Sequence, residues 1–181
     1  MIIPEGGADV AYRNNTYIIF DADNDYWSYM YMRGWKSSEN HDFNFHDAHE
    51  LGSELTDRAS EETVKRTLRL RFSSAKQAIV LVGAKTRNLY RFVRWEMDVA
   101  LDLNLPIVAV HLQQCPNWYD AERVPPILRS GYAVHVPYRM RIIQHALDEF
   151  PLQYARRGPS DTGPLFYPKA VYQRLGLDEC L

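Results

Sequence analysis

Cysteine and long hydrophobic runs are scarce in this sequence. Only Cys115 and Cys180 occur among its 181 residues, which indicates no disulfide framework and favours a reducing, cytoplasmic setting. No run is long and apolar enough to span a membrane. The N-terminal residues MIIPEGGADV also lack the basic region and apolar stretch of a secretory signal. We therefore expect neither export nor a membrane partner.

An excess of charge and the common nucleotide-binding fingerprints are missing as well. The formal net charge of −2 argues against a nucleic-acid partner, because general nucleic-acid binders usually carry a basic excess. The sequence contains no GxGxxG, no GxxxxGK followed by Ser or Thr, and no GxSxG. These absences exclude the usual dinucleotide loop, the P-loop and the nucleophile elbow of α/β-hydrolases.

What is present is a regular alternation of apolar runs and helical patterns. Short β-branched and aromatic runs predict buried strands, and amphipathic stretches between them predict helices. This order predicts an α/β fold with a doubly wound, mostly parallel five-stranded sheet. The expected strands cover 16–20, 42–46, 78–82, 106–110 and 132–136, and the expected helices cover 26–36, 60–72, 90–104 and 139–149.

The composition divides the chain into three parts. Residues 1–15 read as an N-terminal arm, 16–150 as the α/β domain and 151–181 as a C-terminal extension. The extension begins with a Pro/Gly/Ser-rich linker over 152–165. It ends in a short helix, with Pro168 near its first turn and Gly176 just past its end.

One carboxylate stands out in the helix predicted over 90–104. At helical spacing, Glu96 lines up with the apolar residues Val93 and Ala100, opposite a charged stripe. A carboxylate on an apolar stripe is costly unless it has a partner or a function. Its helix follows a strand in an α/β pattern, where such folds bind ligands. The charged stripe consists of Arg91, Arg94, Asp98 and Asp102.

Two interpretations of Glu96 remain open from the residues alone. In the first, its carboxylate stabilises a developing positive charge or handles a proton. In the second, it is a buried glutamate paired with a nearby cation, for which the candidates are Lys85, Arg87 and Arg91.

The loops after two of the predicted strands are candidates for ligand contact. Phe20, Asp21 and Asp23 follow the first strand, where a doubly wound fold borders its ligand crevice. Two carboxylates there would repel a bare pyrophosphate, so contacts to a ribose or a base are favoured. Alternatively, Asp23 or Asn24 simply caps the next helix. Gly83 and Thr86 follow the strand over 78–82, and a glycine permits a tight turn close to a ligand.

Three histidines lie close together in the sequence. His41, His46 and His49 alternate with acidic residues, but their spacing matches no common zinc pattern. We therefore expect a solvated loop and no metal site.

Four segments together resemble a known family. They are the strand Tyr17–Asp21 with Asp25-Tyr26-Trp27, the motif F-x-F-x-D-A at 43–48, the strand Ile79–Gly83 with Thr86, and Val93-Arg94-Trp95-Glu96. In this combination they resemble the TIR-like domains of the bacterial Thoeris antiphage system. The resemblance covers about residues 16–112.

The resemblance implies a flavodoxin-like TIR fold and an enzyme of the NAD⁺ nucleosidase or ADP-ribosyl cyclase type. NAD⁺ would be its substrate, with no bound cofactor. Cleavage of the nicotinamide–ribose bond would give an ADP-ribose-derived, often cyclic, signal that activates a separate ThsA-like effector. Activity would depend on a phage trigger and on self-association. Glu96 matches the catalytic glutamate, and the substrate pocket would include Phe20, Asp21, Asp23, Tyr26, Trp27, Asp47, Ala48, Gly83 and Thr86.

Two other functions fit the same fold class. A non-catalytic TIR-like module would bind a nucleotide or a phage protein and act through assembly, since doubly wound folds host many functions. Such a module has no need of a carboxylate at position 96. A flavin-binding flavodoxin-like protein is disfavoured, because the loop after the first strand is not rich in Ser, Thr and Gly.

Overall fold

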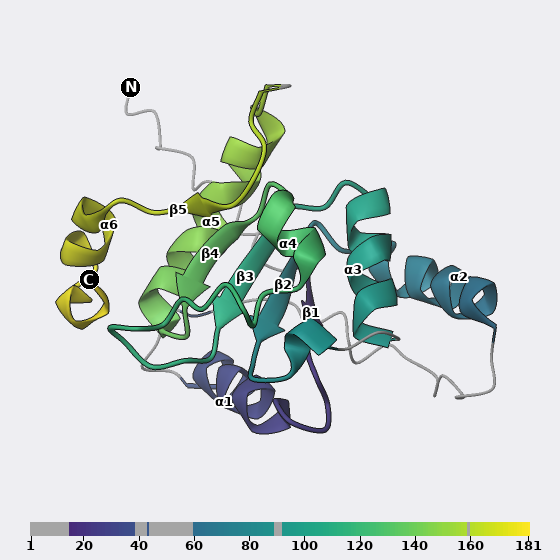
Figure 1. The fold of residues 1–181 in the computed structure, drawn as a ribbon, viewed down its shortest axis with the longest axis horizontal. Helices are drawn as coiled ribbons and strands as arrows, with labels where there is room; N and C mark the ends of the chain where they lie inside the picture. The colour runs from purple at the N-terminus through teal and green to yellow at the C-terminus, as the bar shows by residue number, and fades with distance from the viewer. Residues whose placement is uncertain (1–14, 39–42, 44–59, 89–91, 159) are drawn as a thin grey trace, which may run out of the picture.

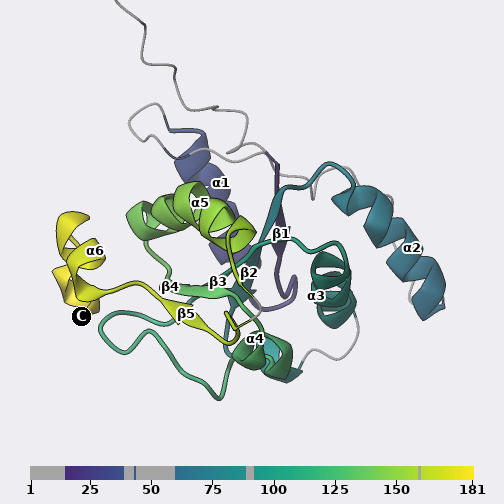
Figure 2. The same cartoon turned by 90° about the horizontal axis from the view of Figure 1, so that it is seen from above.

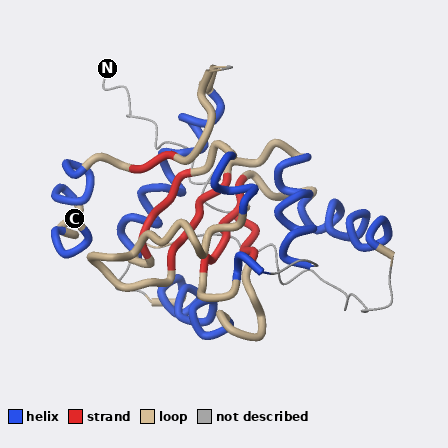
Figure 3. Tube along the Cα trace, viewed as in Figure 1, coloured by secondary structure: helices blue, strands red, loops and turns tan. Residues whose placement is uncertain are grey.

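A twisted parallel sheet forms the centre of the molecule (Figure 1). The computed structural model describes residues 15–38, 43, 60–88, 92–158 and 160–181. Within these residues the sheet, whose strands are red in Figure 3, has five strands in the order β1-β2-β3-β4-β5, and every neighbouring pair is parallel. The strands are β1 (Thr16–Ile19), β2 (Gln77–Val82), β3 (Ile107–His111), β4 (Val134–Pro137) and β5 (Leu165–Phe166).

The sheet is covered by helices on both faces, which explains why its inner strands are continuously apolar. Figure 2 shows α1 (Tyr26–Lys36) and α5 (Met140–Ala155) on one face and α3 (Phe92–Asp102) and α4 (Pro126–Ser130) on the other. The apolar residues of α2 (Glu61–Phe72) share a buried cluster with those of α3, so α2 belongs to this second face. Alternate residues of β1, β2 and β3 therefore enter two separate cores.

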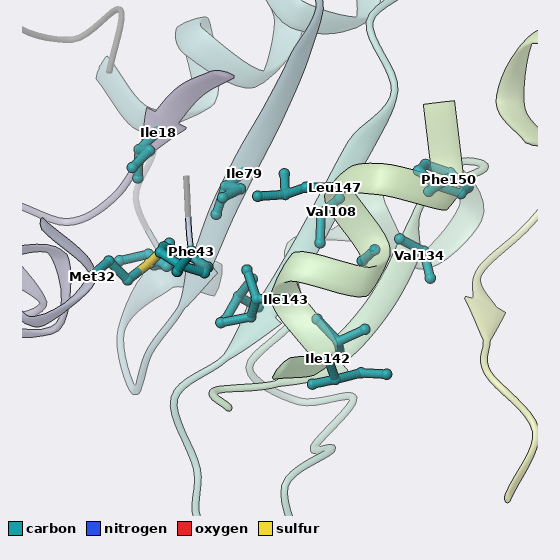
Figure 4. Close-up of a cluster of buried hydrophobic side chains, with 14 of the residues drawn as sticks. Ile18, Met32, Phe43, Ile79, Val108, Val134, Ile142, Ile143, Leu147 and Phe150 are labelled. Carbon is teal, nitrogen blue, oxygen red and sulfur yellow. The ribbon is translucent and has the colours of Figure 1, made fainter. Parts of the chain in front are cut away.

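The core on the α1 and α5 side is built around one apolar helix face. Ile143 and Leu147 of α5 lie over Ile79 and Val108 of the central strands (Figure 4). All four side chains are fully buried or nearly so. Phe43 also belongs to this core, with 2% of its side chain exposed.

Helix α2 begins where the sequence predicts. The Ser60 hydroxyl accepts a hydrogen bond from the Thr63 N–H at 3.3 Å, and two glutamates occupy the first turn. Ion pairs fasten α2 to the charged side of α3. Lys65 lies 2.9 Å from Asp98, and Arg69 lies 3.1 Å from Asp102. The charged stripe predicted on α3 thus serves partly as a docking surface for α2.

The predicted α/β fold class is confirmed, while several elements differ from their predicted extents. The predicted strand over 42–46 lies outside the described residues except for Phe43. The fifth described strand is β5, at the end of the segment predicted as a linker. Helix α5 also extends into that segment, because Phe150, Pro151 and Tyr154 continue its buried face. Burial of this face outweighs the hydrogen bond that a proline removes from a helix.

The C-terminal extension adds short helices beyond β5. They are α6 (Lys169–Arg174) and the 3-10 helix η4 (Asp178–Cys180). As predicted, Pro168 precedes α6 and Gly176 follows it, with φ of 65° at the glycine. No helix in the described part of the chain is long and apolar enough to cross a membrane.

The two cysteines are bonded to each other, contrary to the prediction. Cys115 follows β3 and Cys180 lies in η4, and their Cα atoms are 4.6 Å apart. Their separation of 65 residues concealed this contact, which arises only because β5 and α6 return the chain to the sheet. Beside the bond, the Trp118 indole N–H donates to the Cys180 carbonyl at 3.2 Å.

Candidate active site

Glu96 lies on the buried face of α3, as the helical pattern predicts. Its neighbours on that face are Val93, Met97 and Ala100, and only 7% of Glu96 is exposed. The Tyr17 hydroxyl of β1 donates a hydrogen bond of 2.9 Å to its Oε1. A carboxyl group is thus held against the sheet, in a largely apolar core, by one phenol.

Burial has a strong effect on this carboxyl group. It raises the pKa of Glu96 to about 7, although the Tyr17 hydrogen bond and the positive charge of Arg71 each act to lower that pKa. Arg71 comes from the last turn of α2. Burial and the nearby carboxylate raise the pKa of Tyr17 well above its usual range. At neutral pH, Glu96 is therefore divided between its neutral and ionised forms, and Tyr17 keeps its proton.

Among the described residues, neither Lys85 nor Arg87 is the hydrogen-bonding partner of Glu96. Arg87 instead binds Glu122, through both the side chain and the backbone carbonyl. Lys85 is exposed, and Arg91 lies outside the described residues. The predicted pairing with Lys85 or Arg87 was wrong because the nearby groups, Tyr17 and Arg71, come from other elements. The alternative pairing with Arg91 stays a prediction.

A second group of polar residues lies where β1 and β2 end. Because these strands are parallel neighbours, the loop after Ile19 and the loop after Val82 meet at the same edge of the sheet. The Gly83 N–H donates to the Thr86 hydroxyl at 2.8 Å, and that hydroxyl lies 3.5 Å from an Asp25 carboxylate oxygen. Thr86 begins η3 (Thr86–Asn88), which leads toward α3.

Asp25 is the buried member of this group. It occupies the N-cap position of α1, but its side chain makes no capping hydrogen bond. A Cβ atom on Gly83 would overlap with its carboxylate, so the glycine permits this close approach. Burial, and then the charge of Asp21, raise the pKa of Asp25 to about 6. The predicted caps, Asp23 and Asn24, both precede the true N-cap residue.

The remaining residues of the first loop fold back onto Asp21. Its carboxylate accepts the Asp23 N–H at 3.1 Å and the Asn24 side-chain N–H at 2.5 Å. Asp21 is 4% exposed, whereas Asp23 is exposed. The loop is therefore ordered by its own aspartate, in the manner of an Asx turn.

The aromatic residues predicted to contact substrate fall into two groups. Phe20 is buried and stacks on Tyr29 at 4.5 Å between ring centroids, so it belongs to the core. Tyr26 and Trp27 begin α1 and are 46% and 73% exposed. Of the three predicted aromatic residues, Tyr26 and Trp27 present aromatic surface to solvent, and Phe20 does not.

Some predicted residues lie outside the described part of the chain. These are the substrate-pocket residues Asp47 and Ala48 and the histidines at 41, 46 and 49. Among the residues that the structure does describe, no group of three or more His, Cys, Asp or Glu side chains is arranged to hold a metal.

The sequence reasoning missed Tyr17, Arg71 and Asp25. A signal for Tyr17 was present, because it shares a strand face with Ile19, and that face turns toward α3. The contact of Arg71 depends on how α2 and α3 pack together, which local patterns do not encode. Asp25 was read as part of a capping loop, and only the fold shows that its carboxylate turns toward Gly83 instead.

Comparison with known protein families gives a match over the first part of the α/β domain. The family described as Thoeris protein ThsB, TIR-like domain, matches residues 17–117. The matched region runs from β1 to the segment after β3 and includes Glu96, Tyr17 and the Asp25–Thr86 group. It indicates a role in Thoeris antiphage signalling. Because the match covers more than half of the chain, the protein belongs to the family of Thoeris ThsB proteins with a TIR-like domain.

Proposed function

We propose that this protein cleaves the nicotinamide–ribose bond of NAD⁺ and converts the ADP-ribose part into a signal, cyclic in form, for a separate effector. The observation that carries the proposal is Glu96. Its carboxyl group is buried in an apolar core, bonded to Tyr17, and has a pKa raised by burial to about 7. Such a group costs stability, and strongly perturbed carboxyl groups are concentrated at functional sites.

The chemistry requires little acid catalysis. Nicotinamide leaves NAD⁺ as a neutral molecule, and the ribose develops positive charge as the bond breaks, as in glycoside cleavage. The ionised form of Glu96 would stabilise this charge or hold the ribose hydroxyls. The Tyr17 O–H orients the carboxylate through its 2.9 Å hydrogen bond. We expect the rate to rise with pH near 7, because Glu96 ionises there.

The edge formed by β1 and β2 would bind the rest of the substrate. Gly83 and Thr86 bring a tight loop close to Asp25, and Asp21 fixes the loop after β1. The exposed rings of Tyr26 and Trp27 offer stacking surfaces for nicotinamide or adenine. Exclusion of water around the ribose would favour attack by an adenine nitrogen and hence a cyclic product.

Family membership supports the wider system that we propose. In this proposal NAD⁺ is a substrate, and no cofactor is needed. The product acts in the cytoplasm on a ThsA-like effector, a phage component triggers the enzyme, and self-association assembles the active form. Neither nucleic acid nor a membrane takes part.

The test is the product formed from NAD⁺ by concentrated protein, measured by chromatography with mass detection. Wild-type protein should release nicotinamide and a product with the mass of ADP-ribose or its cyclic form, and Glu96→Gln should abolish both. Glu62→Gln is the matched control, because it makes the same change at an exposed position on α2. Wild-type turnover by Glu96→Gln would show that Glu96 has no catalytic role.

A second candidate is a TIR-like module that binds a nucleotide or a phage protein without catalysis. The observation in its favour is the position of Glu96, which is 7% exposed and already bonded to Tyr17. This function predicts that NAD⁺ stays intact even when lysate of infected cells is added. Linear ADP-ribose as the sole product would instead indicate a plain NAD⁺ hydrolase.

A further inference from the structure

A cleft borders α3 at Arg94, Met97 and Asp98. It has a volume of about 330 Å³ and is formed by η3, α3 and α4. Met97, Pro126 and Ile127 line it with apolar surface, and Arg87, Arg94 and Asp98 line it with charge. Its volume falls within the range of small-molecule sites, which combine apolar walls with a few polar groups.

Only one of the three charged residues lacks a partner. Asp98 is bonded to Lys65 at 2.9 Å, and Arg87 is bonded to Glu122. Arg94 is exposed, and no ion pair or hydrogen bond engages its side chain within the described residues. The cleft therefore has an uncompensated guanidinium beside an apolar surface. An anion with an attached apolar or aromatic body complements both features.

We propose that this cleft binds a small organic anion of mononucleotide size. Its phosphate or carboxylate would meet the planar fork of Arg94, which matches such groups in a two-pronged geometry. Its body would lie on Met97, Pro126 and Ile127. The proposal is independent of NAD⁺ cleavage, because Glu96 faces Tyr17 and does not line the cleft.

The position of the cleft links it to the candidate active site. Met97 directly follows Glu96 on α3, and Arg87 directly follows Thr86 in η3. An occupant would therefore touch both elements that carry the candidate site. This makes the cleft a place where a second ligand contacts those elements without occupying the substrate position.

The experiment is calorimetric titration of the full chain with AMP. We expect wild type to bind AMP, and Arg94→Ala to weaken binding by about tenfold or more, as loss of a charge-assisted contact implies. Arg66→Ala is the matched control, since it removes an exposed arginine from α2, outside the cleft. Arg94→Lys keeps the positive charge but lacks the planar guanidinium, so its affinity for AMP should lie between those of wild type and Arg94→Ala. Parallel titrations with inorganic phosphate, adenosine and benzoate identify which part of the ligand is recognised.

AMP binding that is lost in Arg94→Ala and kept in Glu96→Gln supports the proposal. Equal binding by wild type and Arg94→Ala, or no binding by wild type, overturns it. If Glu96→Gln loses AMP binding and Arg94→Ala retains it, AMP binds at the candidate active site, and this result also overturns the proposal. Binding of benzoate without binding of AMP likewise overturns the proposal, because the occupant would then be a small carboxylate and not an anion of mononucleotide size. Circular dichroism checks that each variant is folded.

Discussion

The buried carboxylate of Glu96 lowers the stability of the folded state at pH values where it is ionised. Its pKa of about 7 lies above the usual value of 4.5, mainly because of burial. The folded state therefore holds a proton that the unfolded state releases between about pH 4.5 and 7. Stability falls as pH rises through this window, and the loss is complete above the folded pKa. Packing alone does not explain a carboxyl group at this position, because its ionisation lowers stability.

Glu96→Gln should therefore stabilise the protein at alkaline pH while removing activity. A glutamine oxygen still accepts the Tyr17 hydrogen bond but carries no charge. At pH 8 we expect the free energy of unfolding to increase by as much as about 3 kcal/mol, from the pKa difference. Near pH 4, where the glutamate is mostly protonated in both states, the gain should nearly vanish. Urea unfolding at the two pH values measures this difference.

The control for this measurement is Glu62→Gln, whose carboxylate is exposed on α2. It should leave stability nearly unchanged at both pH values, as surface substitutions usually do. Superimposable unfolding curves for wild type and Glu96→Gln at pH 8 would contradict the raised pKa of Glu96.

At the scale of elements, a histidine pair joins β3 to β4. His111 Nε2 lies 2.9 Å from His135 Nδ1, and His135 Nε2 lies 3.3 Å from the Leu128 carbonyl of α4. A carbonyl only accepts, so His135 donates through Nε2 and accepts the His111 N–H at Nδ1. Both rings are buried and neutral. Burial lowers the pKa of His111 to about 3 and that of His135 to about 4.

This pair should destabilise the protein as pH falls. The usual histidine value is 6.5, so the unfolded state binds protons below that pH while the folded rings stay neutral. Each histidine should cost about 2 kcal/mol at pH 5 relative to pH 7. His111→Gln should lower stability at pH 7 but reduce its dependence on pH between 7 and 5. Thermal unfolding between pH 7 and 5 measures how steeply stability depends on pH. An equally steep dependence in His111→Gln would contradict a buried, neutral His111.

The elements that local sequence predicts well are those with a strong period or an evident cap. Helix α2 was predicted from the Ser60 cap and the apolar positions Val64, Leu68 and Phe72. Strands β2 and β3 were predicted from their apolar runs. Strand β5 was missed because two residues, Leu165 and Phe166, give no periodic signal. They become a strand only by pairing with Val134 and His135.

In the candidate site, too, local patterns were predicted from the sequence and long-range contacts were not. Glu96 was found because a carboxylate interrupts an apolar helix face, which is a local pattern. Its contact with Tyr17 spans 79 residues and depends on α3 packing across β1. Burial of Phe20 was equally hidden, since a residue after a strand faces either a core or a crevice, depending on the helix that covers it.

At the scale of the molecule, the two faces of the sheet carry different features. The face toward α2 and α3 holds Glu96, the Arg94 cleft and the ion pairs between helices. The chain end lies at the opposite side of the sheet from α2, beyond β5 (Figure 1). There Trp118 and Tyr172 join the core that α5 covers, and the Cys115–Cys180 bond fastens η4 to the segment after β3.

The disulfide should therefore stabilise the whole fold without affecting chemistry at Glu96. It closes a segment of 65 residues. Chain entropy for a loop of this length corresponds to a contribution of about 4 kcal/mol, as an upper value. Reductant should lower the urea midpoint of wild type, whereas a variant with both Cys115→Ser and Cys180→Ser should start lower and not respond. Mass analysis after alkylation without reductant checks the bond directly, because bonded thiols stay unlabelled. Complete labelling of both cysteines in unfolded wild type, or a midpoint insensitive to reductant, would show that the two thiols remain free and that packing of Trp118 and Tyr172 alone anchors the chain end.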